Sequence, residues 1–367
     1  MEKLKFIISG GGTGGHIFPA ISIANALKGK RPDAEILFVG AKGRMEMEKV
    51  PQAGYEIKGL PVVGLNRKNP VQWFSFIWKY FDSKRTAKKI VKDFSPNAVV
   101  GVGGYASAPT LDAAHSLGIP TFLQEQNSYA GKANKMLAKN AKKICVAYDN
   151  MERFFPADKI VLTGNPVRQN LMDTPFKDAD AINAFGLDPG KKTLLIIGGS
   201  LGARTINNSI IGGLSRLKDA GIQVIWQTGK YYFEKAKEEA DKSENPRLTC
   251  TAFIRNMEQA YAVADLVVSR AGASSISELC LLKKPCVLVP SPNVAEDHQT
   301  KNALALSSKN AAVLVKDIDA EAELIDTTLE LIKNDDKLKM LGENIAKLAQ
   351  LDSSERIADI ILNEING

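Results

Sequence analysis

The sequence contains few of the residues that build disulfide frameworks and metal centres. Its 367 residues include four cysteines and three histidines. None of the cysteines, Cys145, Cys250, Cys280 and Cys286, has the Cys-x-x-Cys spacing that zinc and redox motifs use. Three of them lie in apolar runs. We therefore expect reduced thiols in the core of a cytosolic protein.

Long hydrophobic runs and low-complexity segments are also missing. The amino terminus passes from Met1 into a short strand pattern and then into glycines, with no apolar region long enough for an export signal or a membrane span. The composition, 44% hydrophobic and 24% charged, is that of a globular protein. Because one core rarely keeps growing over so long a chain, we expect two domains of about 150 to 200 residues.

Positive charge exceeds negative charge. The net charge of +7 and the pI of about 9.0 indicate an anionic partner, which could be nucleic acid, a phosphorylated metabolite or a membrane surface. An aromatic group is followed directly by basic residues: Trp73, Phe74, Phe76, Trp78, Tyr80 and Phe81, then Lys79, Lys84, Arg85, Lys88, Lys89 and Lys92. This pattern suits a helix on an anionic membrane, and equally an amphipathic helix packed on its own domain.

Short apolar runs alternate with longer helical patterns, which predicts parallel strands joined by right-handed crossovers. Strands are expected at residues 4–9, 35–39, 98–102, 120–123, 143–146 and 160–163, and again at 193–197, 223–227, 247–252, 266–269, 286–289 and 312–315. A proline- and glycine-rich break at residues 164–190 separates the two sets. The pattern predicts two doubly wound α/β domains, with a ligand in the cleft between them.

The most informative segment is residues 7–20, where an apolar run ends in Gly10-Gly11-Gly12-Thr13-Gly14-Gly15-His16 before a helical pattern resumes. Glycines let the backbone approach a ligand closely, and the free amides of a helix N-terminus favour phosphate. The alternative is that the glycines serve tight packing between strand and helix. The second half restarts in the same way with Gly198-Gly199-Ser200-Leu201-Gly202-Ala203-Arg204.

Further polar turns follow other predicted strands. Residues 267–278 form a small-residue turn and a helix start, in which serines could serve as caps but Glu278 suits the two hydroxyls of a ribose. Residues 289–303 contain a polar helix start that could contact a sugar or simply be solvated. Residues 101–109 and 124–127 add polar groups at strand ends in the first half. Parallel strands bring such groups to one edge of a sheet.

Seven motifs, taken in the order in which they occur along the chain, resemble those of the MurG family of peptidoglycan N-acetylglucosaminyltransferases. They lie at residues 10–20, 103–109, 125–127, 164–168, 198–204, 270–278 and 297–303. Any one alone would be weak, but seven in order are specific. The resemblance covers nearly the whole chain. It implies the GT-B fold and an inverting transfer of GlcNAc from UDP-GlcNAc to the C4 hydroxyl of undecaprenyl-pyrophosphoryl-MurNAc-pentapeptide, which converts lipid I to lipid II.

The resemblance also implies a donor site. Residues 166–348 would bind UDP-GlcNAc, with Ser200 at the phosphates, the Ile254 backbone at uracil, Glu278 at the ribose and Gln299 at the sugar. The nucleotide would be lined by Ala273, Ser274, Ser275, Ile276 and Ser277, and further contacts would come from Thr13, Gly14, Gly15, Asn127 and Arg168. No metal or other cofactor is expected.

The acceptor side is implied in the same way. Residues 1–165, completed by a helix at 349–367, would face the membrane, and the acceptor diphosphate would meet Gly12, His16, Gly103, Gly104 and Tyr105. The resemblance favours the membrane interpretation of the basic segment, hence a peripheral protein on the cytoplasmic face of the bacterial cell membrane with no nucleic-acid partner. Family members often carry His before Glu-Gln-Asn, whereas this chain has Gln124, so no proton transfer is assigned there.

An inverting displacement needs a base for the attacking hydroxyl and stabilisation of the leaving UDP. His16 is the candidate base, because imidazole can accept a proton near neutral pH; it could instead donate a hydrogen bond to a phosphate. Without a metal, Ser200, helix N-termini and loop amides must stabilise the diphosphate. His115 and His298 are expected to be structural or peripheral.

Three other functions agree less well with the sequence. A dinucleotide oxidoreductase would carry an acid after the second strand, but Val39-Gly40-Ala41-Lys42 has none. A UDP-GlcNAc epimerase would share the fold and donor pocket but would not need the aromatic and basic segment. A non-catalytic subunit that binds a nucleotide sugar would not need both His16 and a complete donor site.

Overall fold

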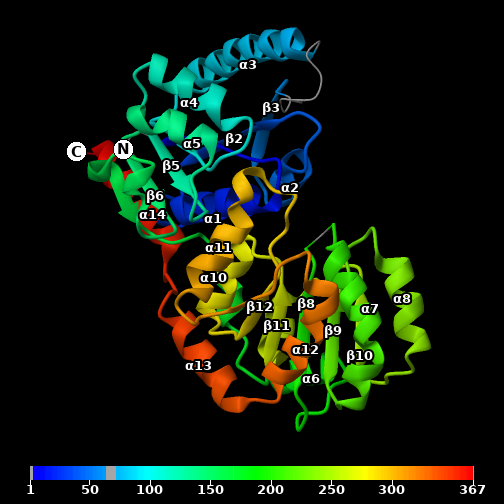
Figure 1. Ribbon diagram of the computed structural model, residues 1–367. Helices are drawn as coiled ribbons and strands as arrows, with labels where there is room; N and C mark the ends of the chain where they lie inside the picture. Colours follow the sequence, from blue (N-terminus) through cyan, green and yellow to red (C-terminus); the bar gives the residue numbers. More distant parts are fainter. Residues whose placement is uncertain (1–2, 63–71, 168, 200, 367) are drawn as a thin grey trace. The chain divides into compact units, whose positions relative to one another are not determined.

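The computed structural model describes residues 3–62, 72–167, 169–199 and 201–366. The chain forms two compact units (Figure 1). The first contains Met1–Arg168 and Gln350–Gly367, and the second contains Gln169–Ala349. Each unit is built around its own parallel sheet, as the alternating pattern predicts.

The first unit has a seven-stranded sheet in the order β3-β2-β1-β4-β5-β6-β7. Its strands are β1 Lys5–Ser9, β2 Glu35–Ala41, β3 Glu56–Leu60, β4 Ala98–Gly101, β5 Thr121–Glu125, β6 Lys143–Val146 and β7 Ile160–Leu162. The strand order reverses at β1, which pairs with both β2 and β4. The two glycine loops that follow β1 and β4 therefore lie at a topological switch point, where doubly wound folds bind ligands.

Helices cover both faces of this sheet because its central strands are apolar on both sides. The helices are α1 Gly14–Lys30, α2 Glu46–Gln52, α3 Gln72–Phe94, α4 Ser107–Ser116, α5 Lys132–Leu137 and α14 Ser353–Asn366. One core joins Phe6 and Ile8 of β1 to α1 and α14, and another joins Ile7 to α3, α4 and α5. The carboxyl-terminal helix α14 lies along α1 (Figure 1). Lys30 of α1 forms ion pairs with Glu355 and Asp359 of α14.

The second unit has a six-stranded sheet in the order β10-β9-β8-β11-β12-β13. Its strands are β8 Thr193–Ile197, β9 Gln223–Gln227, β10 Leu248–Thr251, β11 Leu266–Ser269, β12 Cys286–Leu288 and β13 Val313–Leu314. Here β8 pairs with β9 and β11, so the switch point lies between the loops after β8 and β11. The second glycine-rich turn and the hydroxyl-rich turn are thus neighbours.

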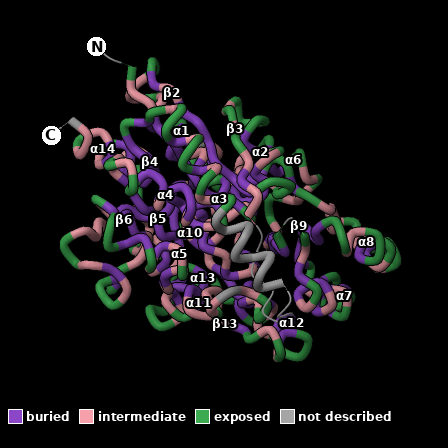
Figure 2. Tube along the Cα trace, turned by 90° about the horizontal axis from the view of Figure 1, so that it is seen from above, coloured by how far each residue is buried: buried purple, intermediate pink, exposed green. Residues whose placement is uncertain are grey.

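The helices of the second unit are α6 Ala179–Ala184, α7 Arg204–Asp219, α8 Phe233–Lys242, α9 Met257–Val263, α10 Ala273–Leu281, α11 His298–Ser307, α12 Ala320–Ile332 and α13 Asp335–Ala346. Buried residues follow the strands in both units (Figure 2). The Trp226 side chain is fully buried, and its Nε1 donates to Asn207 Oδ1 at 3.0 Å. Among the described residues, no helix combines the length and apolar character needed to cross a membrane.

Every strand except β3 lies on a segment that the sequence predicts to be a strand. The first four residues of the β3 sequence Glu-Ile-Lys-Gly-Leu alternate between exposed and half-buried positions at the sheet edge, and only Leu60 is buried, so the segment has no apolar run that would predict a strand. The strand predicted at 120–123 is longer than expected. Gln124 and Glu125 belong to β5 and are buried, instead of forming a turn after it.

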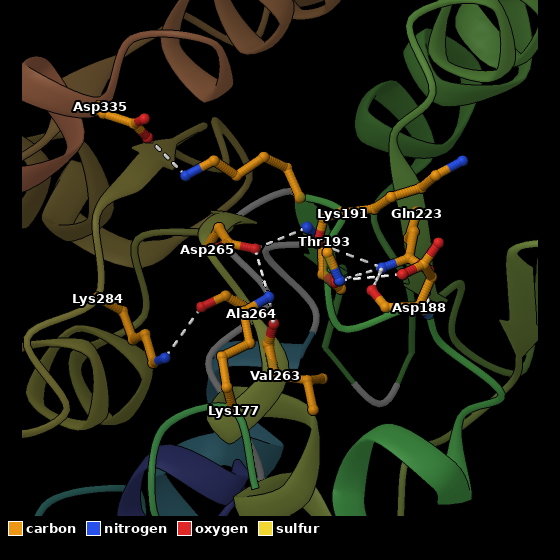
Figure 3. Close-up of polar contacts among 12 residues, drawn as sticks. Lys177, Asp188, Lys191, Thr193, Gln223, Val263, Ala264, Asp265, Lys284 and Asp335 are labelled. Atoms are coloured by element: carbon orange, nitrogen blue, oxygen red, sulfur yellow. Dashed lines mark hydrogen bonds and ion pairs between the residues drawn. The ribbon is translucent and has the colours of Figure 1, made fainter. Parts of the chain in front are cut away.

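A buried lysine, Lys284, lies between α10 and β12 of the second unit (Figure 3). Lys284 Nζ donates to the Ala264 carbonyl at 2.9 Å and lies 4.3 Å from the centre of the Phe176 ring. Next to it, Lys177 Nζ contacts Asp265 Oδ2 at 2.7 Å. Burial lowers the pKa of Lys284 from 10.5 to about 7; Asp265 opposes this shift and Lys177 adds to it.

We predict that Lys284 makes the stability of the protein depend on pH. Between pH about 7 and 10.5 the unfolded chain holds a proton that the folded protein lacks, so the free energy of unfolding rises with pH. The free energy of unfolding, measured by chemical denaturation at pH 7.5 and 9.5, should rise in the unmodified protein relative to Lys284→Met by about 1 kcal/mol per pH unit. Exposed Lys283→Met is the control. An equal difference at both pH values would mean that folded Lys284 stays charged.

Candidate active site

The first glycine loop connects β1 to α1. Gly11 and Gly12 have φ values of 154° and 87°, which side chains rarely adopt. Thr13 is the N-cap of α1, and its carbonyl accepts from the amides of His16 and Ile17 at 3.1 and 3.2 Å. Gly14 and Gly15 begin the helix, so their amides belong to its unsatisfied first turn. The loop has the geometry that an anion site at a helix N-terminus requires.

The second loop, residues 103–105, lies directly against the first. A Cβ atom on Gly104 would lie 2.4 Å from the Gly11 carbonyl oxygen, and one on Gly103 would lie 3.0 Å from His16 Nε2. The Ser107 hydroxyl holds this loop by donating to the carbonyls of Ser9 and Gly103 at 2.8 and 3.0 Å. The structure therefore brings the five predicted acceptor residues together, with the Tyr105 side chain 55% exposed.

His16 is oriented by the loop that precedes it. Its Nδ1 lies 3.0 Å from the Gly11 carbonyl oxygen and 3.4 Å from Thr13 Oγ1. A carbonyl oxygen can only accept a hydrogen bond, so Nδ1 carries the proton in the neutral ring. The lone pair of neutral His16 is then on Nε2, the atom beside Gly103. This is the tautomer that lets Nε2 act as a base.

Asn127 lies in a turn that is held by hydrogen bonds to the Glu125 side chain. Glu125 Oε1 accepts from the backbone and side-chain nitrogens of Asn127 at 3.1 and 3.3 Å, and Oε2 accepts from Asn134 Nδ2 at 2.9 Å. Gln124 is fully buried and its Nε2 donates to Asn165 Oδ1 at 2.9 Å. An amide in this position holds two chain segments together and transfers no proton.

The second unit has a pocket of about 680 Å³ beside the carboxyl ends of β8 and β11. Of the predicted site residues, Ser275 and Gln299 line it. The pocket is also lined by the glycines of the loop after β8 and by Arg204, Thr205, Tyr232, Arg270, Ser291, Asn293 and Asp317. It thus combines helix N-termini, small residues and charged side chains within one unit.

Arg270 and Asp317 form an ion pair in this pocket. Arg270 also donates to the carbonyls of Val289 and Pro290, each at 3.1 Å, and Asp317 accepts from Thr205 Oγ1 at 3.0 Å. Arg270 lies in a motif that the sequence identified, but Asp317 and Thr205 belong to no recognised motif. Asp317 thus compensates the charge of Arg270. Among the described residues that line the pocket, Arg204 is the other one with a cationic side chain.

Helix α10 presents the hydroxyl-rich motif. Ser277 Oγ donates to the Ala273 carbonyl at 3.0 Å, while Ile276 and Ala273 are buried. Ser274 Oγ is buried without a hydrogen-bond partner among the described residues. Of this predicted group, Ser275 reaches the pocket wall. The buried hydroxyl of Ser274 is thus an unsatisfied polar group in the same helical turn.

The remaining residues predicted to bind the donor are hydrogen-bonded to their neighbours. Glu278 is 7% exposed and its Oε2 accepts from the Tyr261 hydroxyl at 3.0 Å. The Ile254 amide donates to Gln227 Oε1 at 3.0 Å, and Gln299 Oε1 accepts from the Ser291 amide at 2.9 Å. The Ile254 amide is therefore engaged by its own protein.

Some predicted positions lie outside the described residues. These are Arg168, Ser200 and the side chains of Trp73, Phe74, Phe76, Trp78, Lys79, Tyr80 and Phe81. Within the described part of the chain, no group of three or more His, Cys, Asp or Glu side chains is arranged to hold a metal ion.

Comparison with known proteins identifies both units. Residues 6–146 match the glycosyltransferase family 28 N-terminal domain, and residues 193–357 match the family 28 C-terminal domain. The chain is 62% identical over 358 residues to UDP-N-acetylglucosamine--N-acetylmuramyl-(pentapeptide) pyrophosphoryl-undecaprenol N-acetylglucosamine transferase of Phocaeicola vulgatus, covering 97% of this chain and 95% of the relative. It is 61% identical to the protein of that name from Bacteroides thetaiotaomicron, covering 99% and 98%.

Solved structures agree. The crystal structure of Acinetobacter baumannii MurG superposes with a TM-score of 0.78 at 26% identity, covering 98% of this chain and 99% of that one. A UDP-GlcNAc 2-epimerase from Neisseria meningitidis, bound to UDP-GlcNAc, has a TM-score of 0.67 at 14% identity, covering 99% and 100%, which shows a shared fold alone. With two Rossmann-like units of the GT-B type and more than half of its residues identical to these transferases, the chain belongs to the MurG family of N-acetylglucosamine transferases in glycosyltransferase family 28.

Proposed function

We propose that this protein moves GlcNAc from UDP-GlcNAc to the C4 hydroxyl of undecaprenyl-pyrophosphoryl-MurNAc-pentapeptide, with inversion at the anomeric carbon. The observation that carries the proposal is the 62% identity, over nearly all of both chains, to a transferase named for this donor and acceptor. The likeness to epimerases is confined to the fold, at 14% identity. The epimerase alternative is therefore not favoured.

The donor is assigned to the second unit, residues 166–348. Its pocket of about 680 Å³ has room for a nucleotide sugar, and the N-termini of α7 and α10 favour the diphosphate. Arg204, the loop amides and Ser200 compensate its charge in this proposal, which needs no metal or cofactor. Glu278 takes the ribose hydroxyls and Gln299 the sugar hydroxyls.

The uracil is placed at Ile254, next to the nucleotide lining from Ala273 to Ser277. Because the Ile254 amide already donates to Gln227 Oε1 at 3.0 Å, uracil either exchanges with that oxygen or uses the Ile254 carbonyl. Thr13, Gly14, Gly15, Asn127 and Arg168 contribute to the donor from the first unit in this proposal.

The acceptor is assigned to residues 1–165 with the carboxyl-terminal helix. The adjoining loops around Gly12 and Gly103 receive its diphosphate, and His16 Nε2 removes the proton of the C4 hydroxyl as it attacks. The Nδ1 contact with the Gly11 carbonyl supports this role, because it leaves the lone pair on Nε2. The other role for His16, donation to a phosphate, requires a proton on Nε2.

The basic segment of α3 is assigned to an anionic membrane surface on the cytoplasmic face. Arg85, Lys88, Lys89 and Lys92 are exposed and spaced i, i+3, i+4 and i+7, so they share one helical face. Lys84 instead pairs with Asp112 of α4 at 3.1 Å. A solvent-exposed row of cations suits phospholipid headgroups better than nucleic-acid base recognition.

The first test is the reaction itself. Incubation of purified protein with UDP-GlcNAc and a lipid I analogue should release UDP and form the β-linked disaccharide, measured by coupled UDP detection and mass spectrometry. Epimerisation of the donor without transfer would indicate an epimerase. Binding of UDP-GlcNAc with neither reaction would indicate a non-catalytic subunit.

The second test concerns the ribose. Glu278→Ala should weaken UDP binding by about ten- to a hundredfold, because hydrogen bonds to a charged group contribute about 1.5–3 kcal/mol. Isothermal titration calorimetry measures this, and exposed Glu234→Gln serves as control. An unchanged dissociation constant with Glu278→Ala would remove Glu278 from the ribose site.

The third test concerns the membrane. Changing Arg85, Lys88, Lys89 and Lys92 to glutamine should reduce binding to phosphatidylglycerol vesicles at least tenfold, since each basic residue contributes about 1 kcal/mol near an anionic surface. A variant with the same net charge is the control, with four exposed lysines of the second unit changed instead: Lys235, Lys309, Lys333 and Lys339. If both variants lose binding equally in sedimentation assays, net charge and not α3 is responsible.

A further inference from the structure

A buried carboxylate lies beneath the first glycine loop. Glu46, the first residue of α2, is 1% exposed. Its Oε2 accepts from the Gly12 amide and its Oε1 from the Ala41 amide, each at 2.9 Å. The first bond reaches the loop after β1 and the second reaches the end of β2. Both oxygens accept from backbone amides, which is the bonding that an ionised carboxylate prefers.

The surrounding chain leaves room for this side chain by using glycine. A Cβ atom on Gly11 would lie 2.2 Å from Glu46 Oε1, and one on Gly40 would lie 2.6 Å from Glu46 Cγ. Real Cβ contacts are not that short, so a larger residue at either position would displace the carboxylate. Gly11 and Gly40 therefore leave the space that the Glu46 side chain occupies.

Glu46 and His16 bind opposite sides of one peptide group. The Gly12 amide that donates to Glu46 and the Gly11 carbonyl that lies 3.0 Å from His16 Nδ1 belong to the same peptide bond. That bond is planar, and its N–H and C=O point in opposite directions. Fixing the N–H therefore fixes the direction of the C=O. The negative charge of Glu46 also polarises the peptide and strengthens the carbonyl as an acceptor.

We infer that Glu46 is a positioning residue for His16, acting through the peptide between Gly11 and Gly12. It keeps the Gly11 carbonyl aimed at Nδ1, which holds the ring in the tautomer with its lone pair on Nε2. The inference rests on the proposed role of His16 as base. It also means that the Gly12 amide is used within the protein, so other amides of the loop meet the acceptor diphosphate.

The test is Glu46→Gln, which keeps the size of the side chain but turns an NH2 group toward one of the two amides. We expect kcat to fall about ten- to a hundredfold, as small misplacements of a reacting group do. The UDP dissociation constant should change much less than kcat, because the residues that line the pocket of the second unit include neither Glu46 nor the loop that it holds. Glu48→Gln, an exposed change on the same helix, is the matched control.

Two readouts separate positioning from a merely structural role. In a His16→Ala background, Glu46→Gln should lower kcat little further, because its effect passes through the missing ring. Nitrogen-15 NMR of the three histidines should show His16 protonated at Nδ1 in the unmodified protein and a mixture of tautomers in Glu46→Gln. An additive loss of kcat, or an unchanged tautomer, would overturn the inference.

Two other experimental results can also be interpreted. If Glu46→Gln does not fold, Gly40→Ala displaces the same side chain from the β2 side and should give the same tautomer mixture; an unchanged tautomer there counts against Glu46. If His16→Ala keeps full activity, the base proposal fails by itself. The NMR comparison then still decides whether Glu46 orients the ring.

Discussion

Close approach of backbone to backbone between neighbouring loops at the carboxyl ends of the strands is the constraint on which both units depend. In the first unit a Cβ on Gly104 would meet the Gly11 carbonyl at 2.4 Å, and in the second a Cβ on Gly229 would meet the Gly202 amide at 2.1 Å. Such spacing excludes side chains, so neighbouring loops pack against each other through peptide groups. The same packing leaves helix N-termini directed at the strand ends, where negatively charged ligands are stabilised. One steric requirement thus produces both the shape and the polarity of each site.

Charged side chains at the proposed sites are bound by other groups of the protein. Arg270 is paired with Asp317 at the pocket of the second unit, and Glu46 lies beneath the first glycine loop. Arg270 is held by a charge of opposite sign and Glu46 by two backbone amides, and both arrangements offset part of the cost of burying a charge. Part of the net charge of +7 lies on exposed faces such as that of α3. In the proposed function, the charge of the ligands is therefore compensated chiefly by backbone dipoles and by Arg204.

The sequence predicted what depends on local pattern. Apolar runs located the central strands, and the glycine turns located the loops at both switch points, because their chemistry is contained in consecutive residues. It missed what depends on partners far apart in the chain. Asp317 lies 47 residues beyond Arg270, and Glu46 lies 34 residues beyond Gly12. In the sequence, a buried carboxylate in a helical segment cannot be distinguished from a solvent-exposed one. The fold shows which residues bury it. The edge strand β3 was missed for a related reason, since its half-exposed face carries no apolar run.

Buried side chains that hold backbone amides recur beside the proposed sites in both units. Glu46 binds the amide of Gly12, and Gln227, 2% exposed, binds that of Ile254 at 3.0 Å. In the second unit Asn207 adds a bond to the Thr228 carbonyl at 2.9 Å, next to the tight contact of Gly229 with Gly202. A glycine-rich loop has many accessible conformations, and ordering it on binding would reduce affinity and rate. Because these bonds form during folding, the loops are already ordered when a substrate arrives. Glycine provides the close approach, and the buried carboxylates and amides remove the flexibility that glycine would otherwise introduce.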